Sequence, residues 1–161
     1  MAKRTTLSSL HLLGLVKHIC HIQKKQEIKI KYEWRKKEKE IYLPKNKPQI
    51  VNIPTFKYFS ITGEGNPNDP FFGQCIKALY SLSYAIRMSY KNGYEPSDFY
   101  EYTVYPLEGI WDINEYAKKN YTGVLDKDSL VFNLMIQQPD FVTKSLANEA
   151  FERTMTKKPH E

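Results

Sequence analysis

Aromatic side chains are concentrated in residues 99–112, which read FYEYTVYPLEGIWD. Aromatic and β-branched residues favour a strand, so we expect one over residues 99–105. Pro106 ends it, because proline has no N–H to donate to a neighbouring strand. Successive side chains of a strand alternate between faces, so Tyr102 and Tyr105 point in opposite directions and the strand is predicted to be central. A wall of aromatic rings with a few polar groups suits a flat, partly cationic organic ligand.

Two acidic residues and a tryptophan complete this stretch. Glu101 lies within the predicted strand, and Glu108 and Trp111 follow its end. A carboxylate beside bound aromatic rings could balance a positive charge or direct water onto an electrophile. Tyr80 and Tyr84, four residues apart on a predicted helix, could line the same cleft from its flank. The sequence therefore predicts Glu108 and Glu101 as catalytic candidates and Tyr80, Tyr84, Tyr102, Tyr105 and Trp111 as ligand-binding residues. For each tyrosine taken singly, the alternative is that its ring fills the core between sheet and helix.

The length of 161 residues suits one domain with a substantial core. The formal net charge is +6, but it is unevenly distributed along the chain. Residues 1–47 hold 13 Lys/Arg and 4 Asp/Glu, a net charge of +9, whereas residues 48–161 hold 11 and 14, a net charge of −3. The body is therefore not selected for a negatively charged partner, and nucleic acid is not the expected ligand.

The cysteine and histidine content predicts neither a disulfide framework nor a metal site. Cys75 lies in a probable helix among apolar residues, where a buried reduced thiol is expected. Cys20 belongs to the sequence His18–His21, but no second cluster of ligands exists elsewhere in the chain. We therefore expect no metal and no cofactor, and a cytoplasmic location.

The first residues do not form part of a predictable fold. The apolar run 7–16 is interrupted by polar residues, lacks a cleavage site, and is too short to span a membrane. Residues 1–31 are therefore predicted to be a poorly ordered leader, and no membrane partner is expected. Residues 31–47 mix charges of both signs around Trp34, which indicates a surface helix with one aromatic anchor.

The remaining patterns predict an α+β fold. No regular alternation of strands and helices occurs, so we expect an antiparallel sheet with helices packed on one face. Gly93 follows the strongest helix as a stop signal. The predicted elements are a strand over 49–63 with a bend at Pro54, a helix at 71–90, a polar loop with one helical turn at 114–128, a strand at 129–137 and a helix at 140–158.

Five stretches together resemble the GyrI-like small-molecule-binding family: KKEKEIYLPKNKP, ITGEGNPN, LYSLSYAIRMSYK, FYEYTVYPLEGIW and IQQPDFVTK. The resemblance implies two strand-helix-strand-strand modules related by a pseudo-twofold axis, with a ligand cleft between them. The family includes drug-sensing domains of transcription regulators and a gyrase-inhibitory protein. It also includes stand-alone members that hydrolyse the cyclopropane ring of genotoxic natural products.

The chain departs from this family in two places. Residues 1–31 match nothing in it, so the resemblance assigns a GyrI-like domain to residues 32–161. Family members continue into a second module, which this chain lacks, so it resembles a fragment or a truncated version. The second module normally supplies a buried acid, which leaves Glu101 and Glu108 as the acidic candidates. If the truncation is natural, two chains could pair as a homodimer to rebuild the cleft.

Three functions remain open from the sequence. The first is a binding domain for planar, hydrophobic or cationic small molecules. The second is a hydrolase that opens a cyclopropane ring on the same scaffold, so enzymatic activity stays undecided. The third is an adaptor that binds nucleic acid or protein through the basic residues 1–47.

Overall fold

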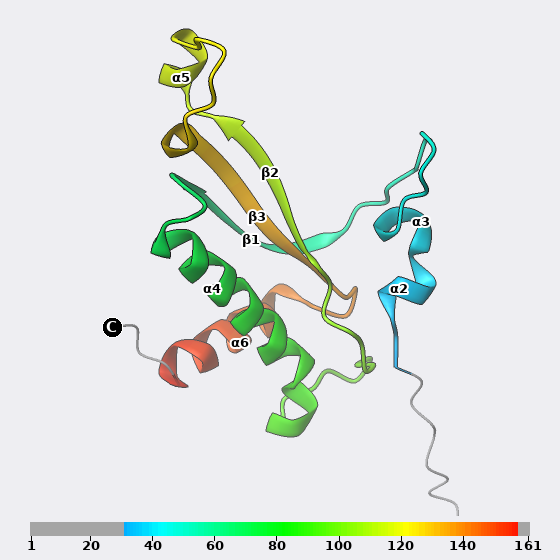
Figure 1. The fold of residues 1–161 in the computed structure, drawn as a ribbon. Coiled ribbons are helices and arrows are strands. Elements are labelled where there is room, and N and C mark those ends of the chain that lie inside the picture. The colour runs from blue at the N-terminus through cyan, green and yellow to red at the C-terminus, as the bar shows by residue number, and fades with distance from the viewer. Residues whose placement is uncertain (1–30, 158–161) are drawn as a thin grey trace, which may run out of the picture. The chain divides into compact units, whose positions relative to one another are not determined.

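The computed structural model describes residues 31–157, so residues 1–30 of the predicted leader, with the His18–His21 group, lie outside the described range. Two short helices come first, followed by a strand, a long helix, a strand pair and a final helix (Figure 1). The elements are α2 (Trp34–Lys37), α3 (Lys39–Tyr42), β1 (Lys57–Glu64), α4 (Pro70–Arg87), η1 (Ser89–Asn92), β2 (Leu107–Ile113), α5 (Glu115–Lys119), η2 (Lys127–Ser129), β3 (Leu130–Gln138) and α6 (Lys144–Lys157).

The three strands form an antiparallel sheet in the order β1-β3-β2, so β3 is central. Alternate residues of β3, namely Phe132, Leu134 and Ile136, are buried. α4 and α6 pack against each other on one face of the sheet (Figure 1). Burying one large apolar side chain stabilises a folded protein by about 1.5–3 kcal/mol. Because β3 and α4 both bury such side chains where they meet, their contact forms the centre of the core. The predicted α+β class, with an antiparallel sheet and helices on one face, is confirmed.

α4 follows the apolar periodicity of its sequence. Cys75, Leu79 and Ile86 lie on one stripe and are buried. Pro70 occupies the first turn, where its missing N–H is not needed. After the helix, Gly93 adopts a left-handed conformation with φ +73° and ends the following 3-10 turn. The predicted helix, its glycine stop and the buried free thiol of Cys75 are confirmed.

The strand predicted for residues 99–105 is wrong. Strand pairing begins after Pro106, and Tyr102 makes only an isolated parallel bridge with Tyr32. The sheet consists of β1, β3 and β2, and this extended segment is not one of its strands. Its rings pack around Phe141 instead, and Tyr102 is only 1% exposed.

The predicted surface helix at residues 31–47 is also wrong in an important respect. The segment forms two short helices separated at Glu38, whose backbone is not helical. Trp34 is buried, and its indole N–H donates to the Val104 carbonyl at 3.1 Å. The segment therefore belongs to the folded body through an aromatic side chain, although most of its other residues are exposed.

The last helix begins later than predicted, at Lys144 and not at residue 140. The Thr143 hydroxyl accepts a hydrogen bond from the Leu146 N–H at 3.2 Å, which caps the first turn. Phe141 and Val142, which precede the cap, are buried in the connection between β3 and α6. The apolar periodicity of the sequence therefore begins before the helix does, because buried apolar residues precede the cap.

The polar loop predicted at residues 114–128 is confirmed, and α5 is its helical turn. The Asn114 side chain accepts the Ala117 N–H at 2.9 Å and caps α5. Within residues 31–157, none of the helices has the length and hydropathy needed to cross a membrane.

Candidate functional site

Six polar side chains meet at the end of the sheet beside α3. We call them the tyrosine–carboxylate cluster, which consists of Tyr32, Glu38, Tyr42, Tyr105, Glu108 and Gln137. Three of them come from the segment before β1, two from the start of β2 and the segment before it, and one from the end of β3.

The sheet register places two of these side chains on one face. On β3, Gln137 follows the buried Ile136 and points to the opposite face, away from α4. Glu108 pairs with Met135, which shares the face of Gln137. The hydroxyl of Tyr42 reaches both side chains from α3.

Glu38 holds the first half of the cluster together. Its Oε1 atom accepts hydrogen bonds from the hydroxyls of Tyr32 and Tyr105, each at 2.7 Å. The Oε2 atom is buried and has no hydrogen-bond partner among residues 31–157. Two phenol donors on one carboxylate oxygen fix the position of the Glu38 side chain.

Tyr42 connects the second half. Its hydroxyl lies 3.2 Å from Glu108 Oε1 and also contacts the side-chain oxygen of Gln137. The Tyr42 ring packs between two others, 5.1 Å from Trp34 and 5.9 Å from Tyr105. These ring contacts fix the position of the hydroxyl relative to the sheet.

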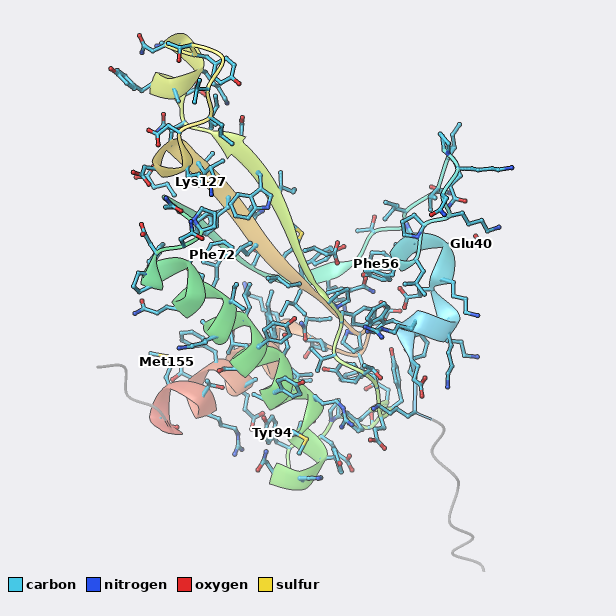
Figure 2. The ribbon with its side chains drawn as sticks, viewed as in Figure 1. Glu40, Phe56, Phe72, Tyr94, Lys127 and Met155 are labelled. Carbon is cyan, nitrogen blue, oxygen red and sulfur yellow. The ribbon has the colours of Figure 1, made fainter. Side chains whose placement is uncertain are left out.

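A cleft of about 280 Å³ adjoins the cluster. Phe56 lies beside α3 in Figure 2, directly before β1, and contributes an aromatic wall to the cleft. The complete lining is Tyr32, Glu38, Ile41, Pro54, Phe56, Tyr100, Tyr105, Gln137, Pro139 and Asp140. A mixture of aromatic rings, aliphatic groups and a few oxygen atoms is suited to a small organic molecule.

The cluster keeps its phenol protons at neutral pH. Burial raises the pKa of Tyr32 to about 12, and its hydrogen bond to Glu38 adds to this effect. Burial also raises the pKa of Tyr42 and of Tyr105, and the neighbouring carboxylates raise them further. These hydroxyls are therefore donors. The pKa of Glu108 is raised by burial, while the hydrogen bond from Tyr42 opposes that shift.

The structure places the sequence-predicted site residues in several locations. Tyr105 and Glu108 lie in the cluster. Tyr102 is buried beneath it, and its hydroxyl donates to the Ser83 carbonyl at 3.4 Å. Glu101 forms an ion pair with Arg87 at 2.7 Å.

The two helix tyrosines do not line the cleft. Tyr80 and Tyr84 lie on α4, with ring centroids 6.4 Å apart, and Tyr84 is exposed. Neither belongs to the lining of the cleft. Their role in ligand binding stays a prediction, as does that of Trp111.

Trp111 occupies a separate place near the start of α4. Its ring lies 5.5 Å from Phe72 and 5.6 Å from Phe132. Figure 2 shows Phe72 well apart from Phe56, which marks the cleft. An open hollow borders Trp111, but no carboxylate of the tyrosine–carboxylate cluster lines it. The structure therefore does not bring Trp111 and Tyr105 together.

Sequence reasoning missed Tyr32, Glu38, Tyr42 and Gln137. One signal was available, because three large aromatic residues occur within the charged segment 31–47. A helix exposed on all sides has no need of several rings, so their presence indicates a buried face. Gln137 carries no comparable local signal, since its position on the outward face depends on the strand register.

Within residues 31–157, no group of three or more His, Cys, Asp or Glu side chains is arranged to hold a metal ion. The cluster offers two carboxylates and several phenols, whose available chemistry is proton transfer and hydrogen bonding. A phosphate-binding glycine loop is likewise not formed by Gly63 and Gly65, because no helix with Lys-Ser/Thr follows.

Several solved structures are similar to this chain. A hydrolase from Listeria innocua shares 29% sequence identity with a TM-score of 0.69, over 80% of this chain and 59% of its own length. An uncharacterized conserved protein from the same organism shares 30% identity, with a TM-score of 0.69 over 80% and 61% of the two chains. A further hydrolase structure from L. innocua shares 30% identity, with a TM-score of 0.70 over 80% and 60%.

This chain therefore spans about three fifths of the length of the structures that it matches. No protein-family model and no curated protein matches it. The similarity supports the fold assignment and connects that fold with proteins described as hydrolases.

Proposed function

We propose that this chain forms part of a hydrolase that acts on a small, largely aromatic organic molecule. The observation that carries the proposal is the link between Glu108 and the aromatic cleft: the Tyr42 hydroxyl contacts both Glu108 and Gln137, and Gln137 lines the cleft. The two similar structures described as hydrolases support the same reaction class. The resemblance to the GyrI-like family suggests a strained cyclopropane ring as the reacting group.

Glu108 is the best candidate for the general base. Burial raises its pKa, and a more basic carboxylate removes a proton from water more readily. Glu101 is less suitable because it is engaged by Arg87. Glu38 is also less suitable, because two phenols already donate to one of its oxygen atoms.

The proposed reaction adds one water molecule to the substrate. The water oxygen forms a bond to a ring carbon while one carbon–carbon bond of the strained ring breaks. The electron pair of the broken bond passes to the conjugated part of the substrate. Glu108 accepts the proton of the attacking water, and the substrate takes up a proton where the electron pair arrives. The phenols that line the cleft, Tyr32 and Tyr105, donate to Glu38 and hold its carboxylate in place.

A second candidate function is binding without turnover. The cleft favours it, because its lining is mostly aromatic and aliphatic with only a few polar groups. The same cavity would hold a planar hydrophobic or cationic molecule, and the carboxylates would balance its charge. Binder and hydrolase therefore use the same residues, and only a turnover measurement separates them.

The test incubates the full chain with a DNA-alkylating natural product that carries a cyclopropane ring. Mass spectrometry is expected to detect a product that has gained the mass of one water molecule. Glu108→Gln should slow this conversion by roughly 10²–10⁴-fold, because it removes the base. The matched control is Glu101→Gln, which changes an acid that is paired with Arg87 outside the tyrosine–carboxylate cluster and should convert the compound at nearly the parental rate.

One other result would contradict the hydrolase, and a second would contradict the role of Glu108 in it. Saturable binding with no product after prolonged incubation would establish the binder instead. Equal loss of turnover in Glu108→Gln and Glu101→Gln, with both variants folded by circular dichroism, would show that Glu108 has no special role.

A further inference from the structure

The hydroxyl of Tyr42 has one proton and two possible acceptors. It contacts Glu108 on β2 and Gln137 on β3, which are both on the face of the sheet opposite α4. A phenol can donate only one hydrogen bond at a time. When the proton points to Glu108, it stabilises the carboxylate; when it points to Gln137, the carboxylate loses that stabilisation.

We propose that Tyr42 is a positioning residue that sets the orientation and the proton affinity of Glu108. The proposal rests on the hydrolase function argued above, in which Glu108 is the general base. Tyr42 does not touch the reacting atoms in this scheme, but it decides how readily Glu108 accepts a proton from water.

Among the groups around Glu108, Tyr42 has the most direct influence on its proton affinity. Within the described part of the chain, neither lysine nor arginine forms an ion pair with Glu108. Tyr42 from α3 is the described side chain that donates a hydrogen bond to it. Tyr58 from β1 and Glu38 from the junction of α2 and α3 belong to the same electrostatic neighbourhood. A phenol donor therefore takes the place that a cation would have in an ion pair.

The surroundings of Tyr42 hold its ring in one place. Trp34 packs on it at 5.1 Å, and the Trp34 indole is anchored to the Val104 carbonyl. Tyr105 packs on it at 5.9 Å and is itself tied to Glu38. A ring fixed on two sides delivers its hydroxyl to a defined point, which is the requirement for a positioning residue.

The experiment follows the titration of Glu108 directly in the full chain, so it needs no substrate. Glutamate labelled with ¹³C at the carboxyl carbon gives one signal per residue, and the Glu108 signal is identified by its loss in Glu108→Gln. Tyr42→Phe should raise the pH midpoint of Glu108, because the ring stays but the donor is lost. The matched control is Tyr58→Phe, which removes a nearby phenol that makes no described hydrogen bond to Glu108.

A second measurement does not depend on the stability of the variant. In the unmodified chain, tyrosine labelled with ¹³C at Cζ should show a shift of the Tyr42 signal at the Glu108 midpoint. The Tyr94 signal should not move there, because its hydroxyl donates to the Ala85 carbonyl at 2.8 Å. A Tyr42 signal that stays constant through the Glu108 titration would overturn the proposal.

The kinetic consequence separates this proposal from the hydrolase function. With the cyclopropane compound, Tyr42→Phe should shift the acidic limb of the profile of hydrolysis rate against pH to higher pH. The rate at a pH near that limb should fall by roughly tenfold. Hydrolysis with an unchanged profile and an unchanged Glu108 midpoint would overturn the role of Tyr42 alone. A shifted midpoint in a chain that binds the compound without hydrolysing it would support the control of Glu108 by Tyr42 and overturn the hydrolase.

Discussion

The tyrosine hydroxyls of the cleft keep their protons because burial and neighbouring carboxylates raise their pKa. As a result, Tyr32, Tyr42 and Tyr105 donate to Glu38 and Glu108, in the way that cations often do in other proteins. A neutral donor stabilises a carboxylate without filling the cleft with positive charge.

Trp34 provides the clearest residue-scale prediction. Its side chain is buried and holds α2 and Tyr42 against the body, so Trp34→Ala should lower the free energy of unfolding by about 3–5 kcal/mol. Urea denaturation measures this loss. Trp111→Ala should cost less, because the Trp111 side chain is 43% exposed. Equal losses in the two variants would contradict the anchoring role of Trp34.

Glu108 should make stability fall as the pH rises. Its folded-state pKa is raised, so the native state holds the proton more tightly than the unfolded chain between the two pKa values. Stability from this group is therefore greatest at acidic pH and decreases as the pH passes through the raised pKa. Glu108→Gln should melt at a slightly higher temperature than the parent at pH 7. Melting curves recorded from pH 4 to pH 7 should show this difference shrinking toward pH 4, and a difference that grows there would contradict the sign.

At the scale of elements, close contacts between strands and helices depend on glycine. A Cβ atom on Gly63 of β1 would lie 2.6 Å from the ring of Phe132, which is buried on β3. A Cβ atom on Gly73 of α4 would meet nothing within 4 Å. The structure therefore requires a residue without a side chain at position 63 but leaves room for one at position 73.

This contrast predicts stability changes of opposite sign. Gly63→Ala should destabilise the fold by about 1–3 kcal/mol, because the buried Phe132 ring must shift. Gly73→Ala should stabilise it by about 0.5–1 kcal/mol, because alanine loses less backbone freedom on forming a helix. Thermal denaturation of the two variants beside the parent tests both signs, and a stabilised Gly63→Ala would show that Phe132 adapts without cost.

At the scale of the whole molecule, residues 31–157 carry the sheet, the helices and the candidate site. The basic segment of the sequence, residues 1–47, overlaps this body, because Trp34, Glu38 and Tyr42 belong to its core and its site. A boundary near residue 30 therefore separates the chain better than one near residue 47.

Removing residues 1–30 should change the melting temperature by less than about 2 °C, since that stretch carries no apolar pattern matched to the core. Removing residues 1–47 should instead unfold the site, because it deletes Trp34 and Tyr42. Differential scanning calorimetry distinguishes the two truncations. A large drop for the shorter truncation would show that the apolar run at residues 7–16 packs on the body.

The same truncation tests nucleic-acid binding. Residues 1–30 hold 6 Lys/Arg and 1 Glu, so they carry five of the six net positive charges. Any affinity for DNA should fall steeply with salt and disappear with these residues, because phosphate contacts release counterions. Salt-resistant DNA binding by the truncated chain, measured by fluorescence anisotropy, would support the adaptor function instead.

Local patterns in the sequence determined most of the helices and strands. α4, β3 and the polar loop containing α5 were predictable, because apolar periodicity, proline and glycine act over a few residues. The pattern of residues 99–105 misled, since a run of aromatic residues favours a strand, whereas these rings pack around Phe141 and the segment stays outside the sheet. The start of α6 misled for a related reason, because the buried Phe141 and Val142 continue an apolar pattern before the Thr143 cap.

The sequence by itself therefore determined the fold class and two members of the cluster, Tyr105 and Glu108, because aromatic and acidic types gather in one stretch. Only the tertiary structure decided which residues join them. Tyr42 and Gln137 are 95 residues apart in the chain, and their contact depends on the register of β3 and on the anchoring of α3 by Trp34. Such contacts form when distant segments bury their apolar surfaces together, and no short stretch of sequence encodes that geometry.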